Sequence, residues 1–187
     1  MLSGRRLDLL DPSPLDIEVE DIAHGLARVA RWNGQTHGPY IFSVAQHSLL
    51  VEAVLRLKSP RYDHSAALAA MLHDAPEYVI GDMISPFKAV IGGAYKDVEK
   101  RLLGAIHVRF GLPAEIDPAL ERRIKAADRG AAYLEATTLA GFGVTESKRL
   151  FGSDPGLPDD IRTDLLTPWP IGKAEKRFLA RFQTLLD

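Results

Sequence analysis

The stretch Ala66-Ala67-Leu68-Ala69-Ala70-Met71-Leu72-His73-Asp74 places two ionisable side chains at the end of an apolar run. Such side chains are costly to bury without a partner. A neutral imidazole and a carboxylate are both good ligands for a divalent ion, so one metal would satisfy both. Adjacent His-Asp pairs also occur by chance. The pair therefore predicts a metal site only if the rest of the chain supplies further ligands.

Composition limits the setting of such a site. With 187 residues, 46% of them hydrophobic, the chain is long enough to bury a sizeable core. We expect one domain over residues 1–187, with its core at about 20–140 and a C-terminal loop and helix, 141–187, packed on it. The net charge of -2 gives no general attraction to a nucleic acid polymer or an anionic membrane. Cysteine is absent, so His, Asp, Glu, carbonyls or water must hold any metal.

The first sixteen residues contain no long apolar stretch. This argues against a signal peptide or a membrane span, and we expect a cytoplasmic protein.

Hydrophobic periodicity predicts an all-α fold, with no run of alternating strands. Ser43 and Gln46 form a capping-box pattern that should begin a helix at this point. Pro86 is suited to open a short helical turn, and the proline-containing segment 152–170 is expected to be loop or short turns. The other expected helices span about 20–31, 63–79, 95–110, 117–139 and 173–186.

The expected helix over 63–79 carries the His-Asp pair. On it His73 and Glu77 are four residues apart and should share a face, where small alanines let neighbouring helices approach closely. His47 lies on the apolar stripe of the helix that begins near Ser43. If that helix packs here, His47 joins the pair from a second direction.

A further acid lies on the expected helix over 117–139. Its inner stripe is Ile124, Asp128, Ala131, Ala132 and Glu135, so that acids replace hydrophobes there. Two His and two Asp, at positions 47, 73, 74 and 128, would suit a divalent transition metal with positions open for water.

Each residue also has a plainer interpretation. A single buried His such as His47 is more often a hydrogen-bonded core residue than a ligand. Asp128 could cap a neighbouring helix or pair with Arg122, Arg123 or Lys125. All the candidates nevertheless fall on apolar faces of separate helices, where unpaired burial costs several kcal/mol per charge. That coincidence favours a shared metal.

The ordered motifs resemble the HD-domain metal-dependent phosphohydrolases. They are Ala45-Gln46-His47-Ser48, Leu72-His73-Asp74-Ala75-Pro76-Glu77 and Lys125-Ala126-Ala127-Asp128-Arg129. The likeness extends over about 21–135. Arg31-Trp32, Glu77 and Gly81-Asp82 followed by Ser85-Pro86-Phe87-Lys88 resemble the bacterial 5'-deoxynucleotidase branch and related small deoxynucleotide triphosphohydrolases. This resemblance implies an HD-domain helical bundle and commonly a homodimer.

The resemblance also implies roles for individual residues. His47, His73, Asp74 and Asp128 would be the ligands of one divalent metal ion, which could be Mn, Co, Fe, Ni or Zn. Glu77 would position or deprotonate the attacking water, with Asp82 as a second acidic helper. Arg31 and Lys88 would neutralise phosphate, and Trp32 could pack against sugar or base. Without the resemblance, these residues could equally be surface charges, helix-end polar groups and a hydrophobic cover.

Three functions remain open from the sequence. The first is hydrolysis of the 5'-phosphate of deoxynucleoside monophosphates by a metal-activated water. The second is release of triphosphate from deoxynucleoside triphosphates, which demands more positive charge around the metal. The third is a non-catalytic metal- or nucleotide-binding module. Intact Glu77 and Asp82 argue against the third.

Overall fold

The computed structural model describes residues 1–58, 63–84, 90 and 93–186. Within these ranges all regular structure is helical, and Ala30 and Ser43 form one isolated β-bridge. The predicted all-α fold class is confirmed. The helices are α1 (Val19–Leu26), α2 (Val44–Lys58), α3 (His64–Met71), α4 (Glu77–Ile80), α6 (Gly93–Arg109), α7 (Pro118–Thr138), α8 (Val144–Phe151), α9 (Asp159–Leu166) and α10 (Ile171–Leu186), with 3-10 turns η1 (Pro14–Asp16) and η2 (Arg31–Gly34).

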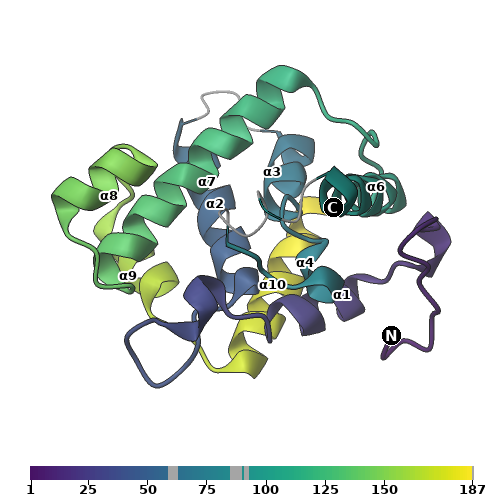
Figure 1. Ribbon diagram of the computed structural model, residues 1–187, viewed down its shortest axis with the longest axis horizontal. Coiled ribbons are helices and arrows are strands. Elements are labelled where there is room, and N and C mark those ends of the chain that lie inside the picture. The colour runs from purple at the N-terminus through teal and green to yellow at the C-terminus, as the bar shows by residue number, and fades with distance from the viewer. Residues whose placement is uncertain (59–62, 85–89, 91–92, 187) are drawn as a thin grey trace.

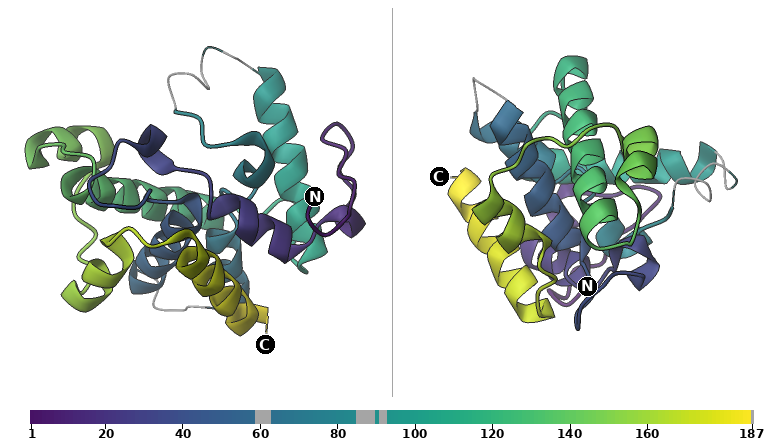
Figure 2. Two further views of the ribbon diagram at one scale, coloured as in Figure 1. Left: turned by 90° about the horizontal axis from the view of Figure 1, so that it is seen from below. Right: turned by 90° about the vertical axis from the view of Figure 1, so that its left-hand side faces the viewer.

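Helix α2 forms the centre of the bundle. Every residue from Val44 to Leu55 is buried. Helix α7 crosses one side of α2 and α10 packs on another, as the right-hand view of Figure 2 shows. Helix α3 contacts both α2 and α10. Because helices surround α2, the polar side chains between Val44 and Leu55 lie inside the protein and need partners there.

The start of α2 follows the predicted cap in part. The hydroxyl of Ser43 accepts a hydrogen bond from the backbone N–H of Gln46 at 3.3 Å. The Gln46 side chain is directed elsewhere. Its Nε2 donates to the carbonyls of Leu165 and Thr167 at 2.8 and 2.7 Å, and its Oε1 accepts from the N–H of Trp169 at 3.1 Å. Gln46 therefore ties the connection between α9 and α10 to the central helix.

The prediction of a single helix over 63–79 is wrong. Helix α3 ends at Met71, and α4 begins only at Glu77. Pro76 lacks an N–H and its ring would clash with the preceding turn, so it prevents one continuous helix. His73 and Glu77 thus do not share a helix face. The His-Asp pair lies instead in the turn between α3 and α4.

Other boundaries agree with the sequence to different degrees. Helices α6, α7 and α10 match their predictions within a few residues, whereas α1 ends five residues before the predicted end at Arg31. Helix α8 was not expected, and α9 lies in the segment expected to be loop. Pro158 is the N-cap residue of α9, and Asp159 and Asp160 occupy its first turn, where acids favour helix formation. The turn expected at Pro86 lies outside the described residues.

Candidate metal centre

His47 enters the centre from α2. Its side chain is fully buried, with Nδ1 at 2.5 Å from Glu135 Oε1. On the other edge of the ring, Nε2 lies 3.4 Å from Asp74 Oδ2 and 3.2 Å from Asp128 Oδ1. Asp128 projects from α7, which packs against α2. One imidazole thus contacts carboxylates from two other segments.

His73 approaches from the turn after α3. Its Nδ1 donates to the carbonyl of Ala70 at 2.8 Å, and its Nε2 lies 3.2 Å from Asp74 Oδ2. The centre of its ring is 5.4 Å from that of His47. Both rings therefore place Nδ1 on an acceptor and direct Nε2 toward the same carboxylate. This is the arrangement in which a neutral imidazole presents a lone pair to a metal.

The donor set fits a divalent cation. His47, His73 and Asp128 offer ligand atoms that all lie within 4.8 Å of one another, and Asp74 Oδ2 is beside both imidazoles. Within the described part of the chain, Nε2 of each His is buried and makes no hydrogen bond of acceptable geometry. A cation would satisfy both atoms. Two nitrogens and two carboxylate oxygens suit a transition metal.

The two candidate aspartate ligands are ionised, which is the state in which a carboxylate binds a metal. Burial raises the pKa of Asp74. The neighbouring imidazoles of His73 and His47 together lower it by more, so the pKa lies well below its usual value. Burial also raises the pKa of Asp128, but His47 lowers it by more, so this pKa too lies below its usual value. Burial and Arg31 lower the pKa of His47, whereas Glu135 and the two aspartates raise it well above the usual value. A metal ion at this Nε2 would therefore displace a proton.

Arg31 lies at the start of η2, next to the carboxylates of the centre. Its Nη1 is 3.9 Å from Asp74 Oδ2 and 3.7 Å from Asp82 Oδ2. Burial lowers the pKa of the guanidinium, but Glu135, Asp74, Asp82 and Asp128 together raise it above its usual value. Arg31 is therefore a permanent cation beside the candidate ligands.

Trp32 has an unusual backbone. Its φ of 56° and ψ of 29° lie in the left-handed region, which bulky residues rarely adopt. The indole Nε1 donates to Glu135 Oε2 at 2.8 Å. The ring packs against Phe142 and Phe151, with centroids 5.5 and 5.8 Å away. These contacts hold the indole next to the centre.

The remaining predicted residues have different positions. Glu77 is the first residue of α4, is 2% exposed, and donates its backbone N–H to the carbonyl of Asp74 at 3.0 Å. Asp82 reaches the centre through its ion pair with Arg31. Lys88 lies outside the described residues.

Glu135 is the residue for which the sequence suggested no role. It contacts His47, Trp32 and Arg31, and it is completely buried. Burial raises its pKa, but His47 and Arg31 lower it to about 2. The signal was an acid on the inner stripe of α7, seven residues after Asp128. That pattern indicates burial but not the partners.

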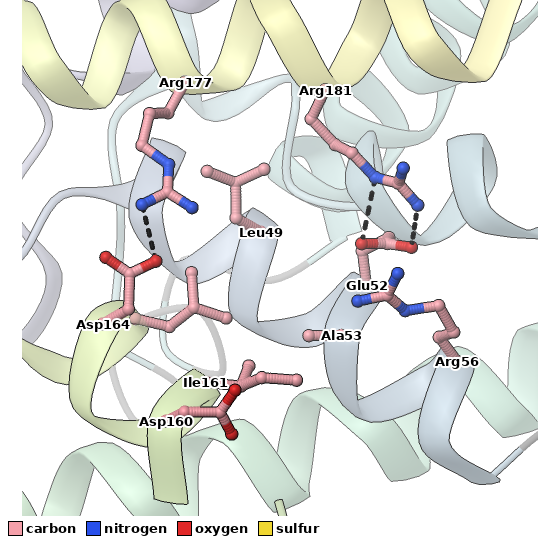
Figure 3. Close-up of a pocket in the computed structure, with 10 residues that line it drawn as sticks. Leu49, Glu52, Ala53, Arg56, Asp160, Ile161, Asp164, Arg177 and Arg181 are labelled. Carbon is pink, nitrogen blue, oxygen red and sulfur yellow. Dashed lines mark hydrogen bonds and ion pairs between the residues drawn. The ribbon is translucent and has the colours of Figure 1, made fainter. Parts of the chain in front are cut away.

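A separate hollow lies between α2, α9 and α10. It has a volume of about 430 Å³, and Figure 3 shows the residues that line it. Four of its charged side chains form ion pairs across it: Arg177 with Asp164 at 2.5 Å, and Arg181 with Glu52 at 2.7 Å. The four candidate ligands are not among the described residues of this lining.

A helical bundle that gathers His, His-Asp and Asp from separate segments around one centre defines an HD-domain phosphohydrolase. The family model described as 5'-deoxynucleotidase YfbR-like matches residues 22–146, and the chain belongs to this family within the HD-domain superfamily. The resemblance stated from the motifs is thus confirmed. An uncharacterized protein of Rhodobacter capsulatus is 55% identical over 187 residues, which cover 100% of this chain and 94% of the relative. Family membership points to a hydrolase of a metal-dependent superfamily.

The described helices do not meet the requirements of a membrane span. None of them combines the necessary length with sufficient apolar character.

Proposed function

We propose that this protein is a metal-dependent phosphohydrolase that removes the 5'-phosphate from deoxynucleoside monophosphates. The observation that carries the proposal is the convergence of two imidazole Nε2 atoms and two carboxylates beside one guanidinium. The match to the YfbR-like 5'-deoxynucleotidase family supports the same reaction class.

His47, His73, Asp74 and Asp128 would hold one divalent ion, which could be Mn, Co, Fe, Ni or Zn. Such an ion, when bound, polarises a phosphoryl oxygen and lowers the pKa of a bound water. Both imidazoles are already oriented for this task by their Nδ1 contacts. These contacts leave Nε2 of each imidazole directed toward the carboxylates of the centre.

The other residues of the centre would bind the phosphate and transfer the proton of the attacking water. Arg31 would bind the phosphate with the paired N–H donors of its guanidinium. This group lies beside Asp74 and Asp82, at 3.9 and 3.7 Å, without a close hydrogen bond to either. Glu77 would position the water and accept its proton, and Asp82 would act as the second acid. Trp32 would pack against the sugar or base. The role of Lys88 as a second phosphate cation stays a prediction.

Electrostatics favour a monophosphate over a triphosphate. Four carboxylates act on the single guanidinium that the described part of the centre contains. A phosphate monoester carries about two negative charges near neutral pH, and a triphosphate carries more. A divalent metal and Arg31 would together supply three positive charges against these four carboxylates, so the described part of the centre has no surplus of positive charge for a longer anion. The smaller anion is therefore the better substrate for this site. Triphosphate release is the alternative that the assay must separate.

The test is a panel of mono- and triphosphates, deoxy and ribo, assayed with each of the five metals. We expect inorganic phosphate and nucleoside from deoxynucleoside monophosphates. Release of triphosphate with no turnover of monophosphates would refute the proposal in favour of the alternative. Retained metal with no product from any nucleotide would instead support a non-catalytic module. Light scattering during gel filtration would check the homodimer, which stays a prediction.

A further inference from the structure

Glu135 is a fully buried acid on the face of α7 that carries Asp128. Seven residues separate the two, so they lie nearly two turns apart on one side of the helix. Asp128 points at His47 Nε2, whereas Glu135 contacts Nδ1 of the same ring. The two acids of α7 thus hold opposite edges of one imidazole.

The two oxygens of Glu135 have different partners. Oε1 faces His47 Nδ1 at 2.5 Å. Oε2 accepts from the indole of Trp32 at 2.8 Å and from Nη2 of Arg31 at 3.5 Å. One carboxylate therefore joins a candidate metal ligand on α2 to the two residues of η2 that face the centre.

Only an acid can serve all three donors. An ionised carboxylate is acceptor-only, with two oxygens for His47, Trp32 and Arg31. A glutamine in this position would offer one oxygen, and its NH₂ would face an N–H donor. At least one of the three contacts would be lost. The buried polar group left behind would then lack a partner.

The backbone of η2 depends on the same contact. Trp32 and Asn33 both have positive φ, at 56° and 52°. Because this conformation is unfavourable for residues with a Cβ, surrounding contacts must maintain it. The indole is held by Glu135 on its polar edge and by Phe142 and Phe151 on its ring.

We infer that Glu135 is a positioning residue that couples metal retention by His47 to the placement of Arg31 and Trp32. Its Oε1 keeps the proton of His47 on Nδ1, so that Nε2 presents a lone pair to the metal. Its Oε2 fixes the indole and guanidinium. The substrate side of this inference rests on the proposed function, and the metal side does not.

The first test measures metal affinity without any nucleotide. Zn²⁺ is titrated into the full chain in competition with a chromophoric chelator. We expect Glu135→Gln to weaken Zn²⁺ binding by about 10–100-fold, the usual effect of removing a hydrogen-bond partner of a ligating His. Glu52→Gln is the matched control. Glu52 is a buried acid on α2 that pairs with Arg181 in the separate hollow of Figure 3, and this variant should bind Zn²⁺ like the wild type.

The second test follows Trp32 itself. The chain has two tryptophans, and the side chains of Lys173 and Arg177 both lie over the ring of the other one, Trp169. Zn²⁺ does not quench fluorescence, so a change in emission on its addition reports a change around an indole. We expect a change in the wild type that is absent in Trp32→Phe. Glu135→Gln should also lack it when Zn²⁺ is saturating, because the link from His47 to Trp32 is cut.

Wild-type Zn²⁺ affinity in Glu135→Gln, or an unchanged Trp32 response at saturating Zn²⁺, would overturn the inference. If the glutamine variant does not fold, Glu135→Asp replaces it. That change keeps the charge but is one methylene too short to reach both α2 and η2, and the same criteria apply. Neither readout requires turnover. A chain that cleaves no nucleotide yet shows both effects would therefore refute the proposed function and retain this inference.

Discussion

Replacing Asp74 by alanine tests the assignment of the metal ligands most directly. Asp74 Oδ2 lies 3.4 Å from His47 Nε2 and 3.2 Å from His73 Nε2, so its removal takes an anionic ligand from between both imidazoles. Loss of an outer hydrogen-bond partner already weakens metal sites by about 10–100-fold. Loss of the ligand itself should weaken Zn²⁺ binding by at least ~100-fold.

The expected change in unfolding free energy follows from this ratio. At a free Zn²⁺ concentration of about 100 times the wild-type Kd, binding stabilises the folded wild type by about 2.7 kcal/mol. At the same concentration Asp74→Ala, with a Kd at least ~100-fold higher, gains at most about 0.4 kcal/mol. For a chain of this length, the metal should raise Tm by roughly 5–11 °C in the wild type and by about 1 °C in the variant.

The assay is thermal unfolding followed by circular dichroism with and without Zn²⁺. Comparing increments removes any effect of the substitution on the metal-free protein. Asp21→Ala is the control, because Asp21 is also buried but binds Ser3, through the N–H at 3.0 Å and the hydroxyl at 2.5 Å. It should keep the full increment. A full increment in Asp74→Ala as well would show that Asp74 is not a ligand.

Three further predictions concern the scaffold that holds the centre. Gln46→Leu should lower the unfolding free energy by about 3 kcal/mol in urea titrations, because it leaves two carbonyls and one N–H near α9 and α10 without partners. Gly25→Ala should cost roughly 1–3 kcal/mol in the same assay, because the added Cβ would lie 2.8 Å from the carbonyl oxygen of Tyr78 on α4. Burial and, secondarily, Asp21 raise the pKa of Tyr78 to about 12. The folded state therefore keeps a proton that the unfolded state releases near pH 10, and stability should fall by about 1 kcal/mol between pH 10 and 12 after allowance for partial exposure.

Each of these predictions has a contrary result. An unchanged urea midpoint for Gln46→Leu would mean that the segment between α9 and α10 does not depend on these bonds. Wild-type stability of Gly25→Ala would contradict the close approach of α1 and α4. For the third, Tyr78→Phe should lose that part of the decline between pH 10 and 12. An identical decline in both proteins would assign it to other groups.

The sequence predicted the regular parts of the fold well. Helix α7 follows from the Asp117-Pro118 start and its inner stripe, and Asp117 Oδ1 indeed accepts from two backbone N–H groups of the first turn. The sequence predicts the position of such a helix because its N-cap residue and its apolar periodicity lie within one continuous segment. The break at Pro76 was missed because the four-residue spacing of His73 and Glu77 was given more weight than the proline between them, which removes a backbone N–H. Helix α9 was missed because the prolines that flank it were interpreted as loop signals.

The candidate centre also has one part that the sequence predicted and one part that it did not. His47, His73, Asp74 and Asp128 were nominated from their positions on apolar faces, since burial of a titratable group is visible in a one-dimensional pattern. The contacts of Glu135 were not predictable. They join α2, η2 and α7, and no local rule specifies that three such distant segments meet at one carboxylate.

By itself, the sequence determined the helical class, the ordered His, His-Asp, Asp set and membership of a phosphohydrolase superfamily, because all of these depend on residue types and spacing. Only the tertiary structure decided where His73 and Asp74 lie, in a turn rather than on a helix. It also decided which edge of each imidazole faces the centre. Those features depend on packing between segments far apart in the chain, which spacing along one segment does not encode.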